Sequence, residues 1–311
     1  MSAPAAPPLL VIAGPTATGK TALAIAVALA LDAGGIPAEV ISADSRQVYR
    51  GLDIGTAKPT LVERRGVVHH GLDLVEPDQA FSVTDFIAHA DGVLSAIAGT
   101  GAIAILAGGT GFYLRAIAAG LDAAALPADP GVRRRIEAEL TVNGLGATVA
   151  RLRELAPARA GQVDLRNPRR VARALEIAEL AGDAPLPEPR PYPGPIAWLG
   201  LDVADRATHA SWIARRARAQ FDAGLVEEAA ALRARFDPSL PAFSAIGYRE
   251  AWAVLDGETD RESAIERNAA RNLAFAKRQR TWFRREPTIE WLDAAGEPLQ
   301  RSVTVARALA G

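Results

Sequence analysis

One stretch near the N-terminus constrains the fold more than any other. It is Gly14-Pro15-Thr16-Ala17-Thr18-Gly19-Lys20-Thr21, placed between an apolar run at 9–13 and an Ala/Leu-rich run at 22–31. Two glycines, a lysine and a threonine at this spacing, between a strand and a helix, are typical of a loop that binds phosphate. We therefore expect these eight residues to bind a diphosphate, with Lys20 contacting it and Thr21 ligating Mg²⁺.

The N-terminal half continues as an α/β pattern. Short apolar runs at 38–42, 67–74 and 102–106 indicate further strands, and Ser82 begins a helix. The run at 102–106 leads into Gly108-Gly109-Thr110-Gly111, and open parallel sheets bind ligands at the carboxyl ends of their strands. These patterns predict an α/β fold: a P-loop core with a mostly parallel sheet flanked by helices.

The pattern changes after residue 121. Asp129-Pro130 and Asn167-Pro168 indicate helix starts, and no strand pattern appears before a proline-rich stretch at 183–195. We expect an inserted all-helical subdomain at 123–195 that interrupts a core of 9–122 and 196–311. The expected helices are 130–140, 146–155 and 168–181 in the insertion, then 205–222, 225–235, 247–255 and 260–285 in the core, where strands are expected at 196–201 and 288–292.

Composition narrows the class of protein. The 311 residues include no cysteine, which excludes disulfides and thiol chemistry and suits the cytoplasm. The longest apolar run, 22–31, is too short to cross a membrane. The net charge is only −1, yet residues 261–285 hold eight basic and two acidic side chains, so this segment carries +6 and the remainder −7. Such asymmetry indicates a local anionic partner.

Three basic residues in that segment recur every seven positions and should share one helix face: Arg271, Arg278 and Arg285. They could position an RNA backbone, or they could form an ordinary charged helix surface. Trp282 and Phe283 are interpreted as core packing. The four histidines (His69, His70, His89 and His209) are scattered, which favours structural roles over a metal site.

Asp44 follows a strand and has three possible roles. It could hold magnesium in an ATPase or a small-molecule kinase, act as a general base facing the phosphate loop, or cap a turn before Ser45. The local residues leave all three open.

The wider pattern resembles the tRNA dimethylallyltransferases, also called tRNA isopentenyltransferases. The resemblance extends from residue 9 to about 292 and lies in several motifs that occur in order. These are the phosphate loop, DSRQVY at 44–49, GLDIGTAKP at 51–59, GGTGFY at 108–113, AIGYRE at 245–250 and AKRQRTWFR at 276–284.

This resemblance implies transfer of a dimethylallyl group from its diphosphate to N6 of adenosine-37, 3′ of the anticodon in tRNA. No nucleotide is then hydrolysed. In such a reaction Asp44 would be the base, Arg216 would stabilise the departing diphosphate, and Thr110 would lie near the target adenine. The implied cofactor is Mg²⁺, and the implied partners are dimethylallyl diphosphate and the anticodon arm of tRNA, with no membrane and a monomeric protein.

The adenine must leave its stack before it can react, so the enzyme needs contacts with the surrounding RNA. Two segments depart from the family pattern: Ala242–Ala245 and Trp212 stand where relatives often carry a basic residue. The tRNA-binding residues implied by the resemblance, or expected from its motifs, are Asp44, Ser45, Arg46, Gln47, Arg133, Arg169, Arg170, Val171, Ala172, Arg173, Arg249, Lys277, Arg278 and Arg284.

Other functions remain open from the residues themselves. A P-loop kinase or ATPase could use the insertion as a helical lid, and a non-catalytic RNA-binding protein could use the loop to bind backbone phosphate. A related class of enzyme prenylates free adenine nucleotides. The basic helix and the helical insertion favour tRNA over a mononucleotide, which needs neither.

Overall fold

The first strand explains why the sheet is covered on both sides. β1 (Leu9–Ala13) is apolar and buried at every position. Because side chains alternate across a strand, Leu9 and Val11 enter one core cluster, whereas Leu10 and Ile12 enter another. Burial on both faces is typical of parallel sheets that have helices on each side.

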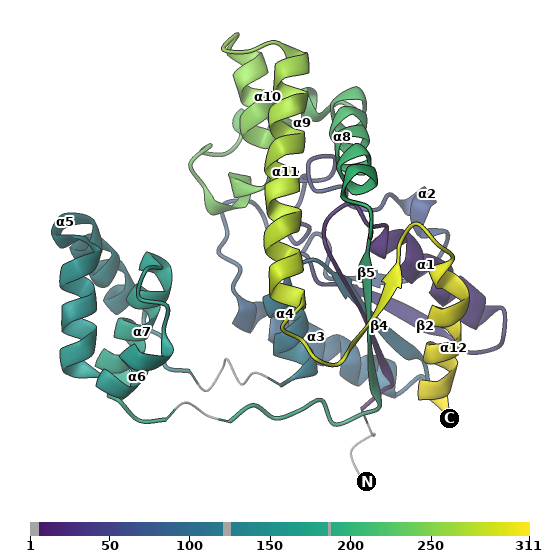
Figure 1. Cartoon of the computed structure of the whole chain (residues 1–311), viewed down its shortest axis with the longest axis horizontal. Coiled ribbons are helices and arrows are strands. Elements are labelled where there is room, and N and C mark those ends of the chain that lie inside the picture. The colour runs from purple at the N-terminus through teal and green to yellow at the C-terminus, as the bar shows by residue number, and fades with distance from the viewer. Residues whose placement is uncertain (1–5, 121–125, 186–187) are drawn as a thin grey trace. The chain divides into compact units, whose positions relative to one another are not determined.

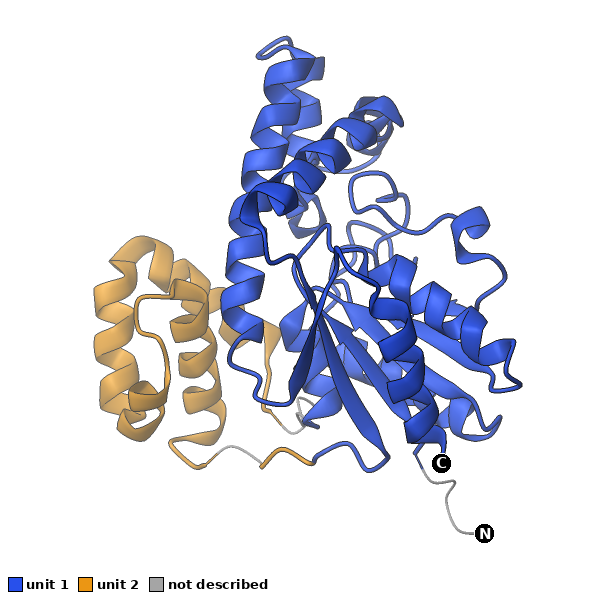
Figure 2. Ribbon diagram, turned by 45° about the vertical axis from the view of Figure 1, so that its right-hand side comes forward, with its two compact units in different colours: residues 1–120, 191–311 blue, residues 121–190 orange. Residues whose placement is uncertain are grey.

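A computed structural model describes residues 6–120, 126–185 and 188–311. The chain divides into two compact units, residues 1–120 with 191–311 and residues 121–190 (Figure 2). In the described parts of the chain, no helix has the length and apolar character needed to cross a bilayer.

The larger unit is built on a six-stranded sheet with the order β3-β2-β4-β1-β5-β6 (Figure 1). Every pairing in it is parallel, which confirms the predicted fold class. The other strands are β2 (Ala38–Ser42), β3 (His69–His70), β4 (Ile103–Gly108), β5 (Ile196–Asp202) and β6 (Ile289–Asp293).

Helices cover each face of this sheet. α1 (Lys20–Asp32) and α12 (Pro298–Ala310) pack against the face that carries Leu10. α3 (Val83–Ala98) and α4 (Gly111–Ala118) pack against the other face. The sequence patterns did not indicate α12.

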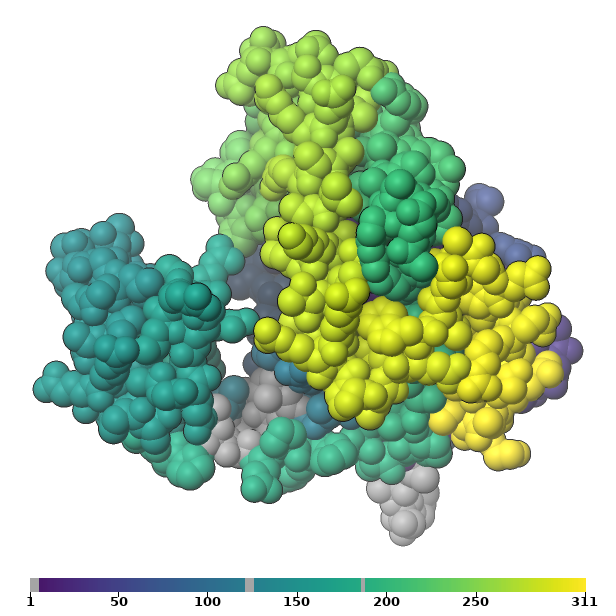
Figure 3. Space-filling view, viewed as in Figure 1, coloured from purple at the N-terminus to yellow at the C-terminus, as the bar shows by residue number. Residues whose placement is uncertain are grey.

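Most of the remaining helices of this unit form a third apolar cluster around Phe243, Tyr248 and Trp252. Figure 3 shows the outer faces of α8 and α11 at the surface, and these two helices pack against each other. The short α2 (Leu61–Arg64) lies outside this cluster. The helices of this third cluster are α8 (Arg206–Asp222), α9 (Leu225–Arg233), η1 (Pro241–Ser244), α10 (Tyr248–Leu255) and α11 (Arg261–Phe283).

The smaller unit is helical in its described residues: α5 (Pro130–Leu155), α6 (Pro157–Gln162) and α7 (Pro168–Ala181). Asp129 and Asn167 cap the first and last of these as predicted, each accepting two backbone N–H groups. Gly144 breaks α5 with a φ of 77°, so the two helices predicted at 130–140 and 146–155 correspond to its two halves.

One strand differs from its predicted length, and two predicted features lie outside the described residues. The strand predicted at 67–74 was wrong in length: β3 contains only His69 and His70, because Gly71 and Asp73 adopt left-handed backbone angles that end it. The predicted insertion start at residue 123, and part of the proline-rich stretch at 186–187, lie outside the described residues.

Candidate active site

The phosphate loop joins β1 to α1 in a tightly packed conformation. Gly14 has a φ of 143°, and a Cβ there would lie 2.2 Å from the carbonyl oxygen of Leu201. Gly19, which precedes α1, has a φ of 81°. Ala17 also lies in the left-handed region, at 61°. An alanine rarely adopts this backbone, so neighbouring contacts must hold the loop in place.

Lys20 is the first residue of α1, and its Nζ donates a hydrogen bond to the carbonyl oxygen of Pro15 at 2.6 Å. Burial and the nearby Arg216 together lower the pKa of Lys20 to about 7, and Asp44 opposes this shift. A phosphate group beside the amine would favour its charged form and raise this pKa.

Contacts from two distant helices hold Thr16 of the loop. Its backbone N–H donates to Oε1 of Gln279 at 2.8 Å, and its carbonyl oxygen lies 2.9 Å from Nε2 of His209. Gln279 also donates through Nε2 to the carbonyl oxygen of Gly109 at 2.9 Å. One side chain of α11 therefore ties the phosphate loop to the glycine-rich turn after β4. Sequence reasoning missed Gln279 as a site residue, although it lies inside a quoted motif.

Asp44 follows β2 and Thr110 follows β4. Because these two strands are parallel neighbours, the two residues lie at the same edge of the sheet. One carboxylate oxygen of Asp44 accepts the N–H of Arg46 at 2.8 Å, which is the turn contact considered for it. Thr110 Oγ1 accepts the N–H of Ser45 at 3.1 Å. Asp44 and Thr110 nevertheless both line a cavity of about 380 Å³, so the turn contact does not remove Asp44 from the site.

A smaller polar cavity of about 70 Å³ shares Thr16, Asp44 and Arg216 with the larger one. Lys20 and Thr21 also line it. Hydroxyl and carboxylate oxygens are ligands that Mg²⁺ accepts, usually together with water and substrate phosphate. The donor set of Thr21 and Asp44 therefore fits a magnesium ion bound together with a diphosphate.

Arg216 extends from α8 and lines both cavities, as well as a third of about 590 Å³ beside Gly19. Burial lowers the pKa of its guanidinium, and Asp44 opposes that shift. Its neighbour Arg218 is exposed and paired with Glu262 at 2.5 Å. The arginine run on α8 therefore has two environments, and Arg216 is the member that faces the candidate site.

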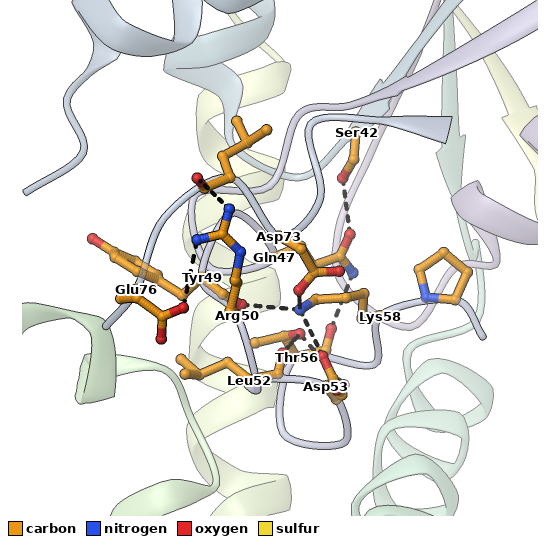
Figure 4. A network of polar contacts seen from close by, with 12 residues as sticks. Ser42, Gln47, Tyr49, Arg50, Leu52, Asp53, Thr56, Lys58, Asp73 and Glu76 are labelled. Carbon is orange, nitrogen blue, oxygen red and sulfur yellow. Dashed lines mark hydrogen bonds and ion pairs between the residues drawn. The ribbon is translucent and has the colours of Figure 1, made fainter. Parts of the chain in front are cut away.

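The loop after β2 is fixed by a buried lysine that sequence reasoning did not identify (Figure 4). Lys58 Nζ donates to the carbonyl oxygen of Tyr49 at 2.9 Å, to Asp53 at 2.6 Å and to Asp73 at 2.5 Å. The signal that could have found it is rarity, because the chain has only three lysines. Lys58 holds the segment that begins with Asp44.

Gln47 lies inside the same network. Its Oε1 accepts from Ser42 Oγ at 2.8 Å, and its Nε2 donates to the carbonyl oxygens of Thr56 and Ala57. Its side chain is buried, so it positions the loop. Contact between Gln47 and tRNA stays a prediction.

Basic residues from two elements face the larger cavity. Arg46, Arg271 and Arg278 line it, so two of the three residues in the seven-residue repeat face the same cavity as Asp44. Arg271 is also paired with the buried Glu250 at 2.5 Å. Four further basic residues considered above are exposed on the larger unit: Arg249, Lys277, Arg284 and Arg285.

In the smaller unit, Arg133 and Arg173 both pair with Glu176, whose side chain is fully buried. Arg169 and Arg170 are exposed in the first turn of α7. Two further positions expected to contact tRNA have buried side chains in the core of this unit, Val171 and Ala172. Contact of these six residues with tRNA remains a prediction.

Histidines and aromatic residues have structural contacts. His70 pairs with Glu39 at 2.6 Å, and in the described parts of the chain no three His, Cys, Asp or Glu side chains gather where they could hold a metal. Phe283 is fully buried in the core, and Trp282 packs against that core, as predicted for both.

A parallel sheet with a phosphate loop after its first strand, and a polar site at the carboxyl ends of its strands, defines a P-loop α/β protein. The sequence profile described as IPP transferase matches residues 47–286, and the profile described as isopentenyl transferase matches residues 7–70. The chain belongs to the IPP transferase family.

Individual relatives agree over nearly the full length. The tRNA dimethylallyltransferase of Anaeromyxobacter dehalogenans (strain 2CP-C) is 46% identical over 297 residues, covering 93% of this chain and 96% of the relative. The crystal structure of the full-length tRNA isopentenylpyrophosphate transferase from Bacillus halodurans is 35% identical, with a TM-score of 0.69 over 98% of this chain and 96% of that one. A Staphylococcus epidermidis structure described as tRNA delta(2)-isopentenylpyrophosphate transferase has 29% identity and a TM-score of 0.68, covering 97% and 98%.

Proposed function

We propose that this chain transfers a dimethylallyl group from dimethylallyl diphosphate to N6 of adenosine-37 in tRNA, with release of diphosphate. One observation carries the proposal. Lys20, Asp44 and Arg216 surround one small polar cavity, and this cavity shares residues with a larger one that basic side chains line. A diphosphate fits the cationic part, and a flat purine requires the larger space.

The leaving group is held by the loop. Backbone N–H groups at the start of α1, together with Lys20 and Arg216, would stabilise the negative charge that increases as the allylic C–O bond breaks. Magnesium bound at Thr21 would neutralise part of that charge. Lys20 would exchange its contact with the Pro15 carbonyl oxygen for one with the diphosphate.

The acceptor amine needs a base. As the bond forms between N6 and the allylic carbon, the nitrogen must lose a proton, and Asp44 is the carboxylate beside the diphosphate site that can accept it. Thr110 lines the same cavity and is hydrogen-bonded to the segment that carries Asp44. We assign Thr110 to contact with the adenine.

Arginine contacts around the larger cavity would position the RNA. Arg46 and Arg278 line it, and phosphate contacts by such side chains fix orientation without reading sequence. We further propose a cytoplasmic location and a monomeric protein.

The test is a transfer assay with purified protein, Mg²⁺ and an unmodified anticodon stem-loop. Label from dimethylallyl diphosphate should enter the RNA. A matched stem-loop with guanosine at position 37 lacks the N6 amine and should take up no label. Equal labelling of both RNAs would refute the assignment of the acceptor atom.

A further inference from the structure

We propose that His209 is a positioning residue for the phosphate loop: its Nε2–H holds the carbonyl of Thr16, and Arg280 fixes the imidazole in that tautomer. This inference rests on the proposed function, because it assumes that the loop binds diphosphate. His209 belongs neither to the loop nor to the Asp44 segment, and it is distinct from Arg216.

The contacts of the imidazole define its protonation. His209 lies in the first turn of α8 and is 1% exposed. Its Nδ1 is 2.9 Å from a terminal nitrogen of Arg280, and its Nε2 is 2.9 Å from the carbonyl oxygen of Thr16. A guanidinium can only donate and a carbonyl can only accept. The imidazole is therefore neutral, with its hydrogen on Nε2.

Arg280 is itself held in place. Its Nε and terminal nitrogen donate to Asp202 at 2.8–3.0 Å, and both side chains are largely buried. Burial opposes ionisation of Asp202, but hydrogen bonds from Arg280 and Arg206 lower the pKa of its carboxyl. A continuous series of contacts thus runs from the end of β5, through α11 and α8, to the phosphate loop.

The Thr16 carbonyl is a sensitive point in the loop. A planar trans peptide directs its C=O and N–H to opposite sides. Holding this carbonyl toward His209 therefore turns the N–H of Ala17 away from His209, where it is available to an anion. Ala17 has the left-handed backbone that alanine disfavours, so an external contact is needed to keep this peptide orientation.

Protonation would break the arrangement. A second proton would sit on Nδ1 and face the donors of Arg280. Burial lowers the pKa of His209; the charges of Arg280 and Arg206 also lower it, whereas the Thr16 hydrogen bond and Asp202 raise it. Acid should therefore weaken the hold on the loop.

Two substitutions separate the two nitrogens. In His209→Gln the amide reaches the Nε2 position and can still donate to Thr16, whereas in His209→Asn it reaches only the Nδ1 position and keeps the Arg280 contact alone. Binding of magnesium pyrophosphate, measured by calorimetry, needs neither tRNA nor prenyl transfer. We expect His209→Gln to bind within about twofold of the unsubstituted chain and His209→Asn to bind about tenfold more weakly, the effect of one lost hydrogen bond.

The pH dependence of pyrophosphate affinity is a readout that would not change if His209 had a purely structural role. The affinity of the unsubstituted chain relative to His209→Gln should fall as the pH falls, because only the unsubstituted chain has an imidazole at this position that can take up a proton. Ionisation of pyrophosphate and of Lys20 affects both proteins alike and cancels in the ratio. This ratio also carries the test if His209→Asn does not fold. Equal affinities for the two variants, or a ratio independent of pH, would overturn the role of His209. Failure of the unsubstituted chain to bind pyrophosphate would instead overturn the proposed function, and this inference with it.

Discussion

The backbone N–H of Thr16 donates to the side-chain oxygen of Gln279 at 2.8 Å, although the two residues are 263 positions apart. The side-chain nitrogen of Gln279 donates to the carbonyl oxygen of Gly109, in the turn after β4. A Cβ at Gly109 would lie 2.3 Å from Nε2 of Gln279, so the fit is close. The basic helix α11 is therefore part of the framework of the diphosphate site as well as a candidate RNA surface.

Gln279→Ala should reduce both stability and pyrophosphate binding. The substitution leaves the buried N–H of Thr16 without its acceptor, which costs about 1–3 kcal/mol. Denaturant unfolding and calorimetry with magnesium pyrophosphate measure the two effects. Gln279→Glu keeps an acceptor for Thr16 but loses the donor to Gly109 and adds a buried negative charge beside the diphosphate site, so it should also weaken pyrophosphate binding. A Gln279→Ala protein as stable as the original would show that this contact is dispensable.

Asp44→Asn should lower kcat by roughly 10²–10⁴-fold, the usual contribution of a general base. The amide oxygen can still accept the N–H of Arg46 and can still ligate Mg²⁺ beside Thr21, so the turn should survive and the affinity for diphosphate should fall far less than kcat. Steady-state kinetics at saturating RNA, together with pyrophosphate binding, separates the two quantities. Near-normal turnover would show that Asp44 only stabilises the turn and is not the general base.

Lys20 should take up a proton when diphosphate binds. Its pKa is about 7 in the free protein, so at pH 8 the amine is largely neutral, and a bound anion raises the pKa and favours the charged form. Calorimetry in buffers of different ionisation enthalpy measures the protons exchanged. In Lys20→Arg the side chain is always charged, so the uptake should be smaller by up to one proton. Identical proton exchange in the two proteins would contradict this ionisation.

Lys20→Ala should abolish turnover, because it removes the cation that contacts the diphosphate. Pyrophosphate binding should be lost in parallel, and the folded state should persist by circular dichroism. Turnover that survived in Lys20→Ala would count against the loop as the diphosphate site.

Arg278→Ala should weaken tRNA binding and flatten its salt dependence. One lost phosphate contact lowers the slope of log K against log salt by about 0.7–0.9. Filter binding of the stem-loop over a salt series measures this slope. Arg301→Ala is the control, because it removes an exposed arginine that pairs with Glu290 on the other side of the sheet from α11. Equal slopes in the two variants would make α11 an ordinary charged surface.

Local patterns predicted the strands, the phosphate loop and the caps, because each depends on neighbouring residues. They placed Asp44 and Thr110 at one edge, since parallel strands end together. Gln279, His209 and Lys58 could not be found in this way, because their roles come from contacts between distant segments. Local patterns also could not separate Arg216 from the exposed Arg218; the family resemblance alone distinguished them.

The boundaries of elements were harder to predict than their existence. The strand expected at 67–74 ends early because Gly71 and Asp73 turn the backbone, and apolar periodicity does not report backbone angles. α12 was not predicted, although Leu299, Val303 and Ala306 recur at helical spacing and pack against one face of the sheet.

The most direct test of the central claim compares two donors in one reaction. Purified protein is incubated with Mg²⁺, the unmodified stem-loop and equal amounts of dimethylallyl diphosphate and ATP, each labelled in the group it would transfer. The proposed chemistry predicts dimethylallyl label on the base at position 37, release of diphosphate and intact ATP. Transfer of the terminal phosphoryl group of ATP, with dimethylallyl diphosphate unchanged, would contradict it.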